Sequence, residues 1–297
     1  MTKVAPRRVI DVLMSPPAPQ AKSGQIALTG LRLLAGLMWL ENVVWKVPPD
    51  FGERTRGGLY FWTTRAVEFP VWKPYSWLLE HLVLPNFTLF GWGVFVIESA
   101  LVVLLLTGTA VRLAALLGVA QSIAIGLSVA EAPNEWPWAY AMMIGIHAVL
   151  VFAPSAQYAA VDALWSGTAT TARRLLGGWG IALGLIALVA LCVYLRYDRR
   201  ANVGILDLEF SLGDYNLWGT LLLIGVAVAM LAAAMFGWRL AALVAGGVAL
   251  AGAASIYVQV GRTDVWLGGT PSTAAVFACG AVVGLAAGLK LAQSKGA

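Results

Sequence analysis

Four polar side chains interrupt apolar stretches of this 297-residue chain and could do chemistry there: Arg32, Glu98, Gln121 and His147. If the stretches are helices across a membrane, a rise of 1.5 Å per residue places them roughly 9, 12, 15 and 9 Å from the same membrane face. Ionisable groups at such depth cost several kcal/mol and commonly mark a functional site. The similar depths predict that the four side chains converge on one intramembrane pocket.

The residue types in this group suit acid–base and carbonyl chemistry. Glu98 would carry or accept a proton, and Arg32 would hold it ionised or polarise a carbonyl group. We predict an ion pair between Arg32 and Glu98, because an unpaired charge at this depth is costly. Two alternatives stay open. The pair could be structural, or Arg32 could extend to the headgroups while His147 bonds a neighbouring helix.

A second polar group lies near the end of the first apolar stretch: Glu41, Asn42, Trp45 and Lys46. Glu41 and Trp45 are four residues apart, so they share one face of a helix. The group is a candidate for a second, weaker pocket at the outer membrane face. It is also typical of an interfacial belt, in which tryptophan and lysine anchor the end of a helix.

The segment 46–86 that follows is rich in aromatic residues. Its stretch 75–84 has the pattern of an amphipathic helix lying in the membrane interface. The segment could be a plug seated in the membrane or a lid over the outer pocket. As a lid, it would bring Arg54, Arg56 or Arg65 to face an anion.

The composition indicates that the chain is solvated by a lipid bilayer. Hydrophobic residues make up 60% of it, charged residues make up 12%, and the mean hydropathy is +0.78. Soluble domains carry about twice that charge fraction. The net charge of +5 does not indicate a nucleic-acid-binding protein, because the basic residues stand at the ends of apolar stretches, as topology determinants do.

Apolar stretches of about 20 residues predict membrane-spanning helices. We expect an all-α integral membrane protein with about eight spans, two pairs of which are joined by tight turns around Arg112 and Arg239. The basic residues of both tails, both tight turns and the segment 166–177 fall on one side, which predicts that both termini are cytoplasmic. The predicted spans are 26–45, 87–106, 111–130, 137–153, 178–196, 217–236, 238–260 and 273–291.

The two halves of the chain share a short motif and an order of loops. Arg112-Leu-Ala-Ala-Leu116 opens the third span, and Arg239-Leu-Ala-Ala-Leu243 opens the seventh. Two four-helix units related as a parallel repeat are therefore expected, the second a degenerate copy of the first. The predicted parts are a cytoplasmic tail at 1–25, a first unit at 26–165, a linker at 166–177 and a second unit at 178–297.

Several cofactors lack their sequence signals. Haem between helices requires a pair of histidines, but only His81 and His147 are present, and one of them lies in a loop. Cys192 and Cys279 form no Cys-x-x-Cys pair and no metal motif, although a disulfide between them is conceivable. No glycine motif for a flavin or another dinucleotide is seen. Electrons that pass through the chain would come from a partner protein or go to a bound quinone.

Short motifs within residues 26–165 carry a resemblance to a known family. They are Leu31-Arg32-Leu33 with Gly36 and Trp39, Glu98 in a glycine-containing span, Leu106-Thr107-Gly108-Thr109 before Val111-Arg112-Leu113, and Phe152-Ala-Pro154 before Asp162-Ala163-Leu164. With these motifs the segment resembles the DoxX family of bacterial membrane proteins, which includes the DoxD subunit of thiosulfate:quinone oxidoreductase. The resemblance implies a four-helix bundle in the bacterial plasma membrane, often the membrane half of a redox complex.

We therefore expect a membrane subunit of a quinone-linked oxidoreductase that works with a redox partner protein. His147 and Gln121 would bind a quinone carbonyl, while Glu98 and Arg32 would be the acid–base and electrostatic groups. Two other functions stay open. The chain could be a non-catalytic scaffold that anchors a partner enzyme. It could also be a small transporter, although its second half brings few polar residues to the membrane midplane.

Overall fold

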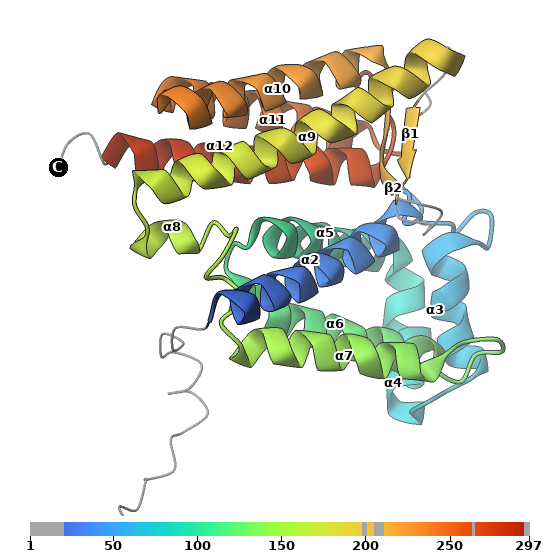
Figure 1. Ribbon diagram of the computed structural model, residues 1–297. Coiled ribbons are helices and arrows are strands. Elements are labelled where there is room, and N and C mark those ends of the chain that lie inside the picture. Colours follow the sequence, from blue (N-terminus) through green and yellow to red (C-terminus); the bar gives the residue numbers. More distant parts are fainter. Residues whose placement is uncertain (1–20, 198–200, 205–210, 263–264, 294–297) are drawn as a thin grey trace, which may run out of the picture.

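The computed structural model describes residues 21–197, 201–204, 211–262 and 265–293, which form two helical layers (Figure 1). We name the layers the first and the second bundle. The first bundle consists of α2 (Lys22–Val44), α5 (Phe87–Thr107), α6 (Val111–Val129) and α7 (Pro137–Phe152). The second bundle consists of α9 (Ala169–Tyr197), α10 (Leu217–Phe236), α11 (Arg239–Gln259) and α12 (Pro271–Gln293).

Short elements connect these long helices at their two ends. We name the end that carries α3, α4 and the β hairpin the loop end, and the end with the α5–α6 and α10–α11 turns the turn end. The connecting elements are α3 (Gly58–Glu68), α4 (Lys73–Leu78), a π-helical turn η1 (Leu79–Val83), a 3-10 turn η2 (Leu84–Asn86), α8 (Ala163–Ser166), and the antiparallel strands β1 (Ala201–Gly204) and β2 (Ser211–Tyr215).

The prediction of an all-α integral membrane protein with about eight spans is confirmed. Seven helical stretches of the described residues are long and apolar enough to cross a membrane, and α7 is a shorter apolar helix of 16 residues. The first and fifth helices begin at Lys22 and Ala169, earlier than the predicted 26 and 178. Corresponding helices of the two bundles run in the same direction (Figure 1), while a duplication of the chain stays a prediction.

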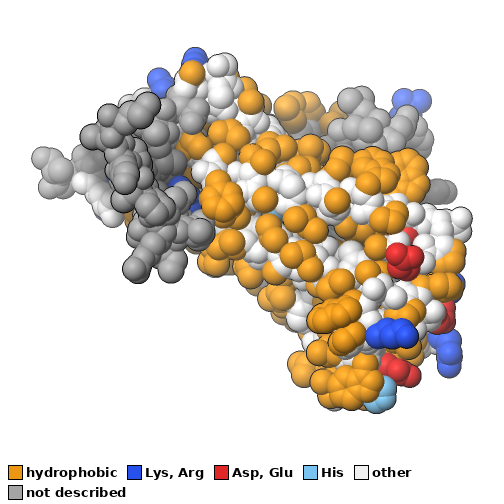
Figure 2. Space-filling model, turned by 90° about the horizontal axis from the view of Figure 1, so that it is seen from below, with side chains coloured by type: hydrophobic (Ala, Val, Ile, Leu, Met, Phe, Trp, Pro, Cys, Tyr) orange, Lys and Arg blue, Asp and Glu red, His pale blue; other side chains and the backbone are white. Residues whose placement is uncertain are grey.

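The surface of the molecule suits contact with lipid. Large apolar side chains are exposed on the long helices, among them Leu89 at 77% and Leu195 at 73%. Figure 2 shows hydrophobic side chains across the middle of one face, while charged side chains gather toward its ends. A bilayer solvates such a surface at no cost, whereas water would not.

Two glycines make the tight turns at the turn end. Gly108 and Gly237 follow α5 and α10 with φ angles of 70° and 67°, the left-handed conformation that commonly ends a helix. At Gly108 a side chain is excluded for a second reason. Its Cβ atom would lie 2.4 Å from the Cβ atom of Ala160 and 2.6 Å from the guanidinium of Arg32.

Helix α12 joins the two bundles. It is the most buried of the apolar spans described, and it packs against α9 and α11 as well as against α5 and α2 of the first bundle. Small residues permit this contact, since a Cβ atom on Gly284 would lie 2.8 Å from the backbone of Gly246. Ala275 of α12 belongs to the apolar core of the first bundle. Each bundle therefore has its own apolar core, and the two cores meet at α12.

Candidate functional site

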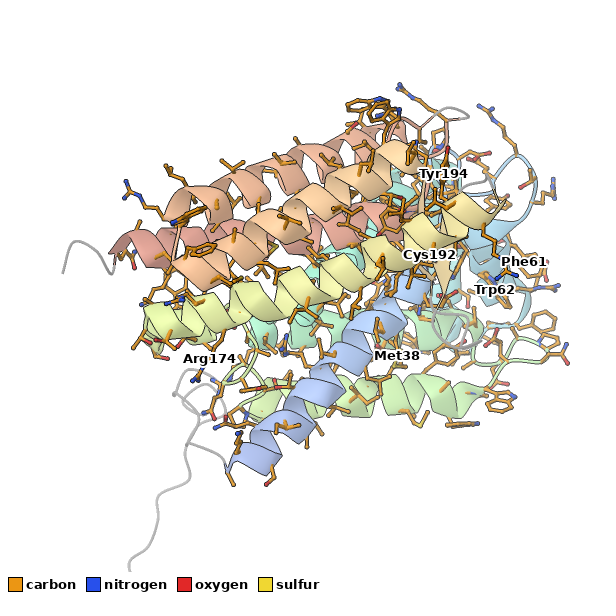
Figure 3. All side chains as sticks on the ribbon, turned by 45° about the horizontal axis from the view of Figure 1, so that its top comes forward. Met38, Phe61, Trp62, Arg174, Cys192 and Tyr194 are labelled. Atoms are coloured by element: carbon orange, nitrogen blue, oxygen red, sulfur yellow. The ribbon has the colours of Figure 1, made fainter. Side chains whose placement is uncertain are left out.

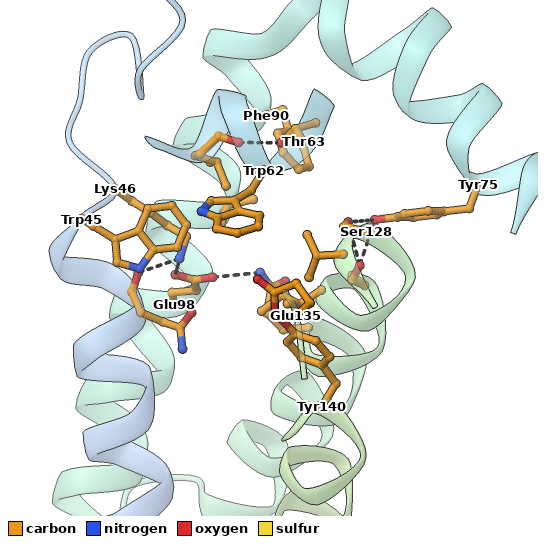
Figure 4. Close-up of a pocket in the computed structure, with 17 residues that line it drawn as sticks. Trp45, Lys46, Trp62, Thr63, Tyr75, Phe90, Glu98, Ser128, Glu135 and Tyr140 are labelled. Atoms are coloured by element: carbon orange, nitrogen blue, oxygen red, sulfur yellow. Dashed lines mark hydrogen bonds and ion pairs between the residues drawn. The ribbon is translucent and has the colours of Figure 1, made fainter. Parts of the chain in front are cut away.

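The first bundle contains a partly open cavity of about 330 Å³ near the loop end. It lies between the α2–α5 pair and the α6–α7 pair, and α3 covers it from the loop end (Figure 4). Aromatic side chains from five different segments form much of its wall. They are Trp45, Trp62, Tyr75, Phe90 and Tyr140.

A buried ion pair forms one polar end of the cavity. The Nζ atom of Lys46 lies 2.7 Å from a carboxylate oxygen of Glu98, and the two side chains are only 3% and 0% exposed. The same Nζ atom donates to the carbonyl oxygen of Asn42 at 2.6 Å and lies 3.8 Å from the centre of the Trp45 ring. Burial lowers the pKa of Lys46 below its ordinary value, while the carboxylate of Glu98 acts in the opposite direction.

Gln121 of α6 joins this ion pair from the other side of the cavity. Its Nε2 atom donates to the second carboxylate oxygen of Glu98 at 3.2 Å. An ionised carboxylate only accepts hydrogen bonds, so the amide must turn its NH2 group toward Glu98. The carbonyl oxygen of Gln121 has no partner among the described residues and remains for a ligand.

A second polar end lies closer to the loop end. Ser128 is seven residues after Gln121 on the same face of α6, so the two polar ends are roughly 10 Å apart along that helix. The hydroxyl of Tyr75 donates to the carbonyl oxygen of Ala124 at 3.2 Å and bonds the hydroxyl of Ser128 at 3.1 Å. The hydroxyl of Tyr140 donates to the carboxylate of Glu135. Apolar side chains between the ends complete an elongated, amphiphilic cavity, among them Leu59, Val94 and Ile125.

The predicted ion pair between Arg32 and Glu98 is wrong. The guanidinium of Arg32 donates to the carbonyl oxygens of Leu105 and Leu106 at 2.6 and 3.2 Å, and to that of Ala159 at 2.9 Å. Side chains lean toward the N-terminus of their own helix. Because α2 and α5 run in opposite directions, Arg32 leans toward the turn end and Glu98 toward the loop end.

Arg32 instead belongs to a network that closes the turn end. The carboxylate of Asp162, the negative charge near Arg32, accepts the backbone N–H groups of Ala110 and Val111 at 2.8 and 3.1 Å. The backbone N–H of Val161 donates to the carbonyl oxygen of Thr107 at 3.0 Å. Asp162 thus satisfies the first N–H groups of α6 from outside the helix. The role of Arg32 in this structure is to hold the end of α5 to the segment between α7 and α8.

His147 is also a structural residue and does not line the cavity. Its Nε2 atom accepts from the indole N–H of Trp39 at 2.8 Å, and its Nδ1 atom pairs with the carbonyl oxygen of Met143 at 2.7 Å. A neutral imidazole has one donor and one acceptor, and both are used here. The ring packs directly on Gly118, where a Cβ atom would lie 2.0 Å away. His147 therefore bonds a neighbouring helix, α2, which is the structural alternative that the sequence left open.

The structure merges parts of the two predicted pockets. Glu98 and Gln121 from the expected inner pocket meet Asn42, Trp45 and Lys46 from the expected outer one. Sequence reasoning missed the residues of the second polar end, although Tyr75 opens the predicted amphipathic stretch and Ser128 follows Gln121 at helical spacing. Glu41, Arg54, Arg56 and Arg65 do not line the cavity, and Arg65 pairs with Glu68 at 2.6 Å.

The segment 46–86 covers the cavity, as the lid hypothesis expected, through α3 and Tyr75 of α4. The hydroxyl of Ser76 donates to the carbonyl oxygen of Ala66 at 2.6 Å and ties α4 to α3. The disulfide that the sequence allowed is not formed, since Cys192 and Cys279 are both free.

Comparison with known proteins adds no relative. No family model matches the chain, and neither a curated protein nor a solved structure matches it significantly. The resemblance to the DoxX family therefore stays a prediction from short motifs, and the function must be argued from the cavity itself.

Proposed function

We propose that the cavity binds the head group of a quinone and that the chain is the membrane subunit of a quinone-linked oxidoreductase. The observation that carries the proposal is an aromatic-walled cavity in a membrane bundle. The Lys46–Glu98 pair and Gln121 form its polar end farther from the loop end, which we name the deep end. Small-molecule sites are mostly apolar with a few polar groups that fix orientation. A quinone, a flat apolar ring with a carbonyl group at each side, has the matching chemistry.

Each residue at the deep end has a role in this proposal. A bound quinone would supply two-electron chemistry, with the electrons exchanged through a redox partner protein. Lys46 and the second N–H of the Gln121 amide hydrogen-bond a carbonyl oxygen of the quinone, and the carbonyl oxygen of Gln121 accepts from the hydroxyl group of the reduced form. Glu98 exchanges one of the two protons that accompany two-electron reduction or oxidation, since its carboxylate lies beside both the Lys46 and the Gln121 donors. Trp45 and Trp62 pack against the ring. Arg32 and His147, expected in these roles, stabilise the bundle instead.

A contribution to folding stability is a weak explanation for the buried Lys46–Glu98 ion pair. Desolvation of two buried charges offsets much of their attraction, and apolar replacements are often neutral or stabilising. Ionisable groups inside a membrane are by default a functional hypothesis. A scaffold subunit without a ligand is the second candidate function, supported by the internal hydrogen bonds of Arg32 and His147.

The Gln121→Leu substitution is expected to weaken quinone binding about tenfold. It removes one hydrogen bond to the ligand, worth about 1–1.5 kcal/mol, and leaves the apolar walls intact. Binding is measured by titrating the purified protein with short-chain ubiquinone and menaquinone analogues. The readouts are quenching of tryptophan fluorescence, to which Trp45 and Trp62 contribute at the cavity, and the shift in melting temperature.

Gln259→Leu is the matched control, because Gln259 lies in the second bundle and bonds Ser255 of its own helix. It should bind quinones as the wild type does. Equal losses in the two variants, or no response of the wild-type protein to any of the quinones, would reject the quinone site and favour the scaffold.

We further propose that the turn end faces the cytoplasm of a bacterial cell, with the chain in its plasma membrane. Arg112, Arg173, Arg174, Arg239 and Lys290 all lie near that end, and basic residues next to spans stay inside.

Labelling of single cysteines tests this orientation in intact cells, in a Cys192→Ser background. A membrane-impermeant thiol reagent should label Thr55→Cys at the loop end directly. It should label Thr170→Cys, at the start of α9, only after permeabilisation. Both positions are exposed. The reverse pattern would invert the proposed topology.

A further inference from the structure

Two adjoining concavities lie at the turn end, far from the quinone cavity. One is a cleft of about 760 Å³ with polar groups from α6, α9 and the segment 153–157. The other is a groove of about 820 Å³ between α2 and α7. Ala153 and Pro154 line both, so the groove leads into the cleft.

The cleft contains a buried hydroxyl group without a hydrogen-bond partner among the described residues. Ser155 is 2% exposed and lines the cleft, and its Oγ atom has no hydrogen bond within the part of the chain that the structure describes. Buried polar groups are nearly always hydrogen-bonded, because leaving them unpaired is costly. Gln157 and Thr171 line the same cleft. The hydroxyl groups of Ser155 and Thr171 could both donate to the oxygen atoms of one ligand.

The charge of the cleft favours an anion. The carboxylate of Asp162 is compensated by two backbone N–H groups and by the nearby buried guanidinium of Arg32. Arg112 also lines the cleft, and a guanidinium has several N–H groups that can donate to a phosphate. Arg174 is exposed one helical turn after Thr171, and it projects from the start of α9 on the side of the first bundle (Figure 3).

The groove has the lining that an acyl chain requires. Gly24, Ala27 and Leu28 of α2 form one wall, and Ala148, Val149 and Phe152 of α7 form the other. None of these six residues has a polar side chain. Phe152 is 55% exposed on the outside of the bundle. A hydrocarbon chain there would extend along the helices, from the membrane surface toward the bilayer centre.

We propose that the cleft and the groove together bind one anionic phospholipid. The phosphate lies in the cleft near Arg112 and Ser155, and one acyl chain lies in the groove between α2 and α7. A cleft with an arginine and hydroxyl donors that opens on an apolar groove at the membrane surface complements a phospholipid, which has a charged group at one end and hydrocarbon at the other. The site is independent of the proposed quinone cavity, which lies at the loop end.

The test is native mass spectrometry of the full-length protein in mild detergent, with added phosphatidylglycerol or phosphatidylcholine of identical acyl chains. Phosphatidylglycerol should bind at least tenfold more tightly. The Arg112→Ala/Ser155→Ala variant should lose about tenfold in affinity for it. The matched control Arg239→Ala, in the equivalent turn of the second bundle, should keep the wild-type affinity. Melting temperatures of all variants confirm that they are folded.

A second variant tests the groove. Ala27→Trp fills it and should weaken binding of phosphatidylglycerol, whereas Ala120→Trp, at an exposed position of α6, should not. Equal binding of the two lipids would overturn the proposal, as would wild-type affinity in the Arg112→Ala/Ser155→Ala variant. Displacement of phosphatidylglycerol by millimolar glycerol phosphate or inorganic phosphate would also overturn it, because it would identify a site for a free phosphate group.

Discussion

The Lys46→Met substitution is expected to destabilise the folded protein by about 3–5 kcal/mol, the usual effect of removing one partner of a buried ion pair. Methionine fills a similar volume, so the loss comes from the charge and the hydrogen bonds. The carboxylate of Glu98 is 0% exposed, and once the Nζ atom 2.7 Å away is gone, Gln121 is its one remaining partner among the described residues. The measurement is denaturant unfolding in detergent, followed by circular dichroism.

The double variant Lys46→Met/Glu98→Leu separates the charge effect from loss of packing. It removes both charges and should recover most of the stability, because an apolar pair of similar size packs well in such a site. Lys73→Met, at an exposed position of α4, is the matched single control and should leave stability unchanged. If the double variant were as unstable as Lys46→Met, the loss of stability would come from altered packing around Lys46, and the explanation by an unpaired buried charge would be wrong.

The Arg32→Met substitution should have a similarly large effect, again about 3–5 kcal/mol. Arg32 is fully buried, and its guanidinium satisfies carbonyl oxygens of Leu105, Leu106 and Ala159 at once. Without it, these acceptors lose the guanidinium as a donor and Asp162 loses the nearby positive charge. The free energy of unfolding is measured as for Lys46→Met.

Arg32→Lys should recover only part of this loss. A lysine is a point charge on a flexible stem and cannot bridge carbonyl groups in two directions as the planar guanidinium does. Arg239→Met removes an arginine from the start of α11 in the second bundle and should have little effect. Wild-type stability in Arg32→Met would contradict the structural role of this residue.

The helices could be predicted because their signals are local. Apolar length identifies the spans, and Arg112 and Arg239 between adjacent spans identify the tight turns, which the structure makes at Gly108 and Gly237. The start of α2 was placed four residues late, since Lys22 and Gln25 extend that helix beyond the hydrocarbon core. The polar residues at its first turn carry no hydropathy signal.

The partners of the polar residues could not be predicted, because depth along a helix gives neither rotation nor side-chain direction. Arg32 and Glu98 were assigned similar depths, yet their side chains lean toward opposite ends of the bundle. For Lys46 the sequence leaves an outer pocket and an interfacial belt as alternatives. In the structure its long side chain returns along the last turn of α2, as the 2.6 Å contact with the carbonyl oxygen of Asn42 shows, and thereby enters the cavity. Hydropathy alone cannot distinguish these two directions.

The position of α12 determines the order in which the protein can be assembled during synthesis. This helix covers α5 and α2, but it is the last of the spans to leave the ribosome. At about 5–20 residues per second, the roughly 160 residues between α5 and α12 take about 10–30 s to translate. Throughout that interval the face of α5 that later contacts α12 is exposed to lipid or to an insertion chaperone. A chain terminated before residue 271 would therefore leave the first bundle incomplete, and membrane quality-control proteases would be expected to degrade it.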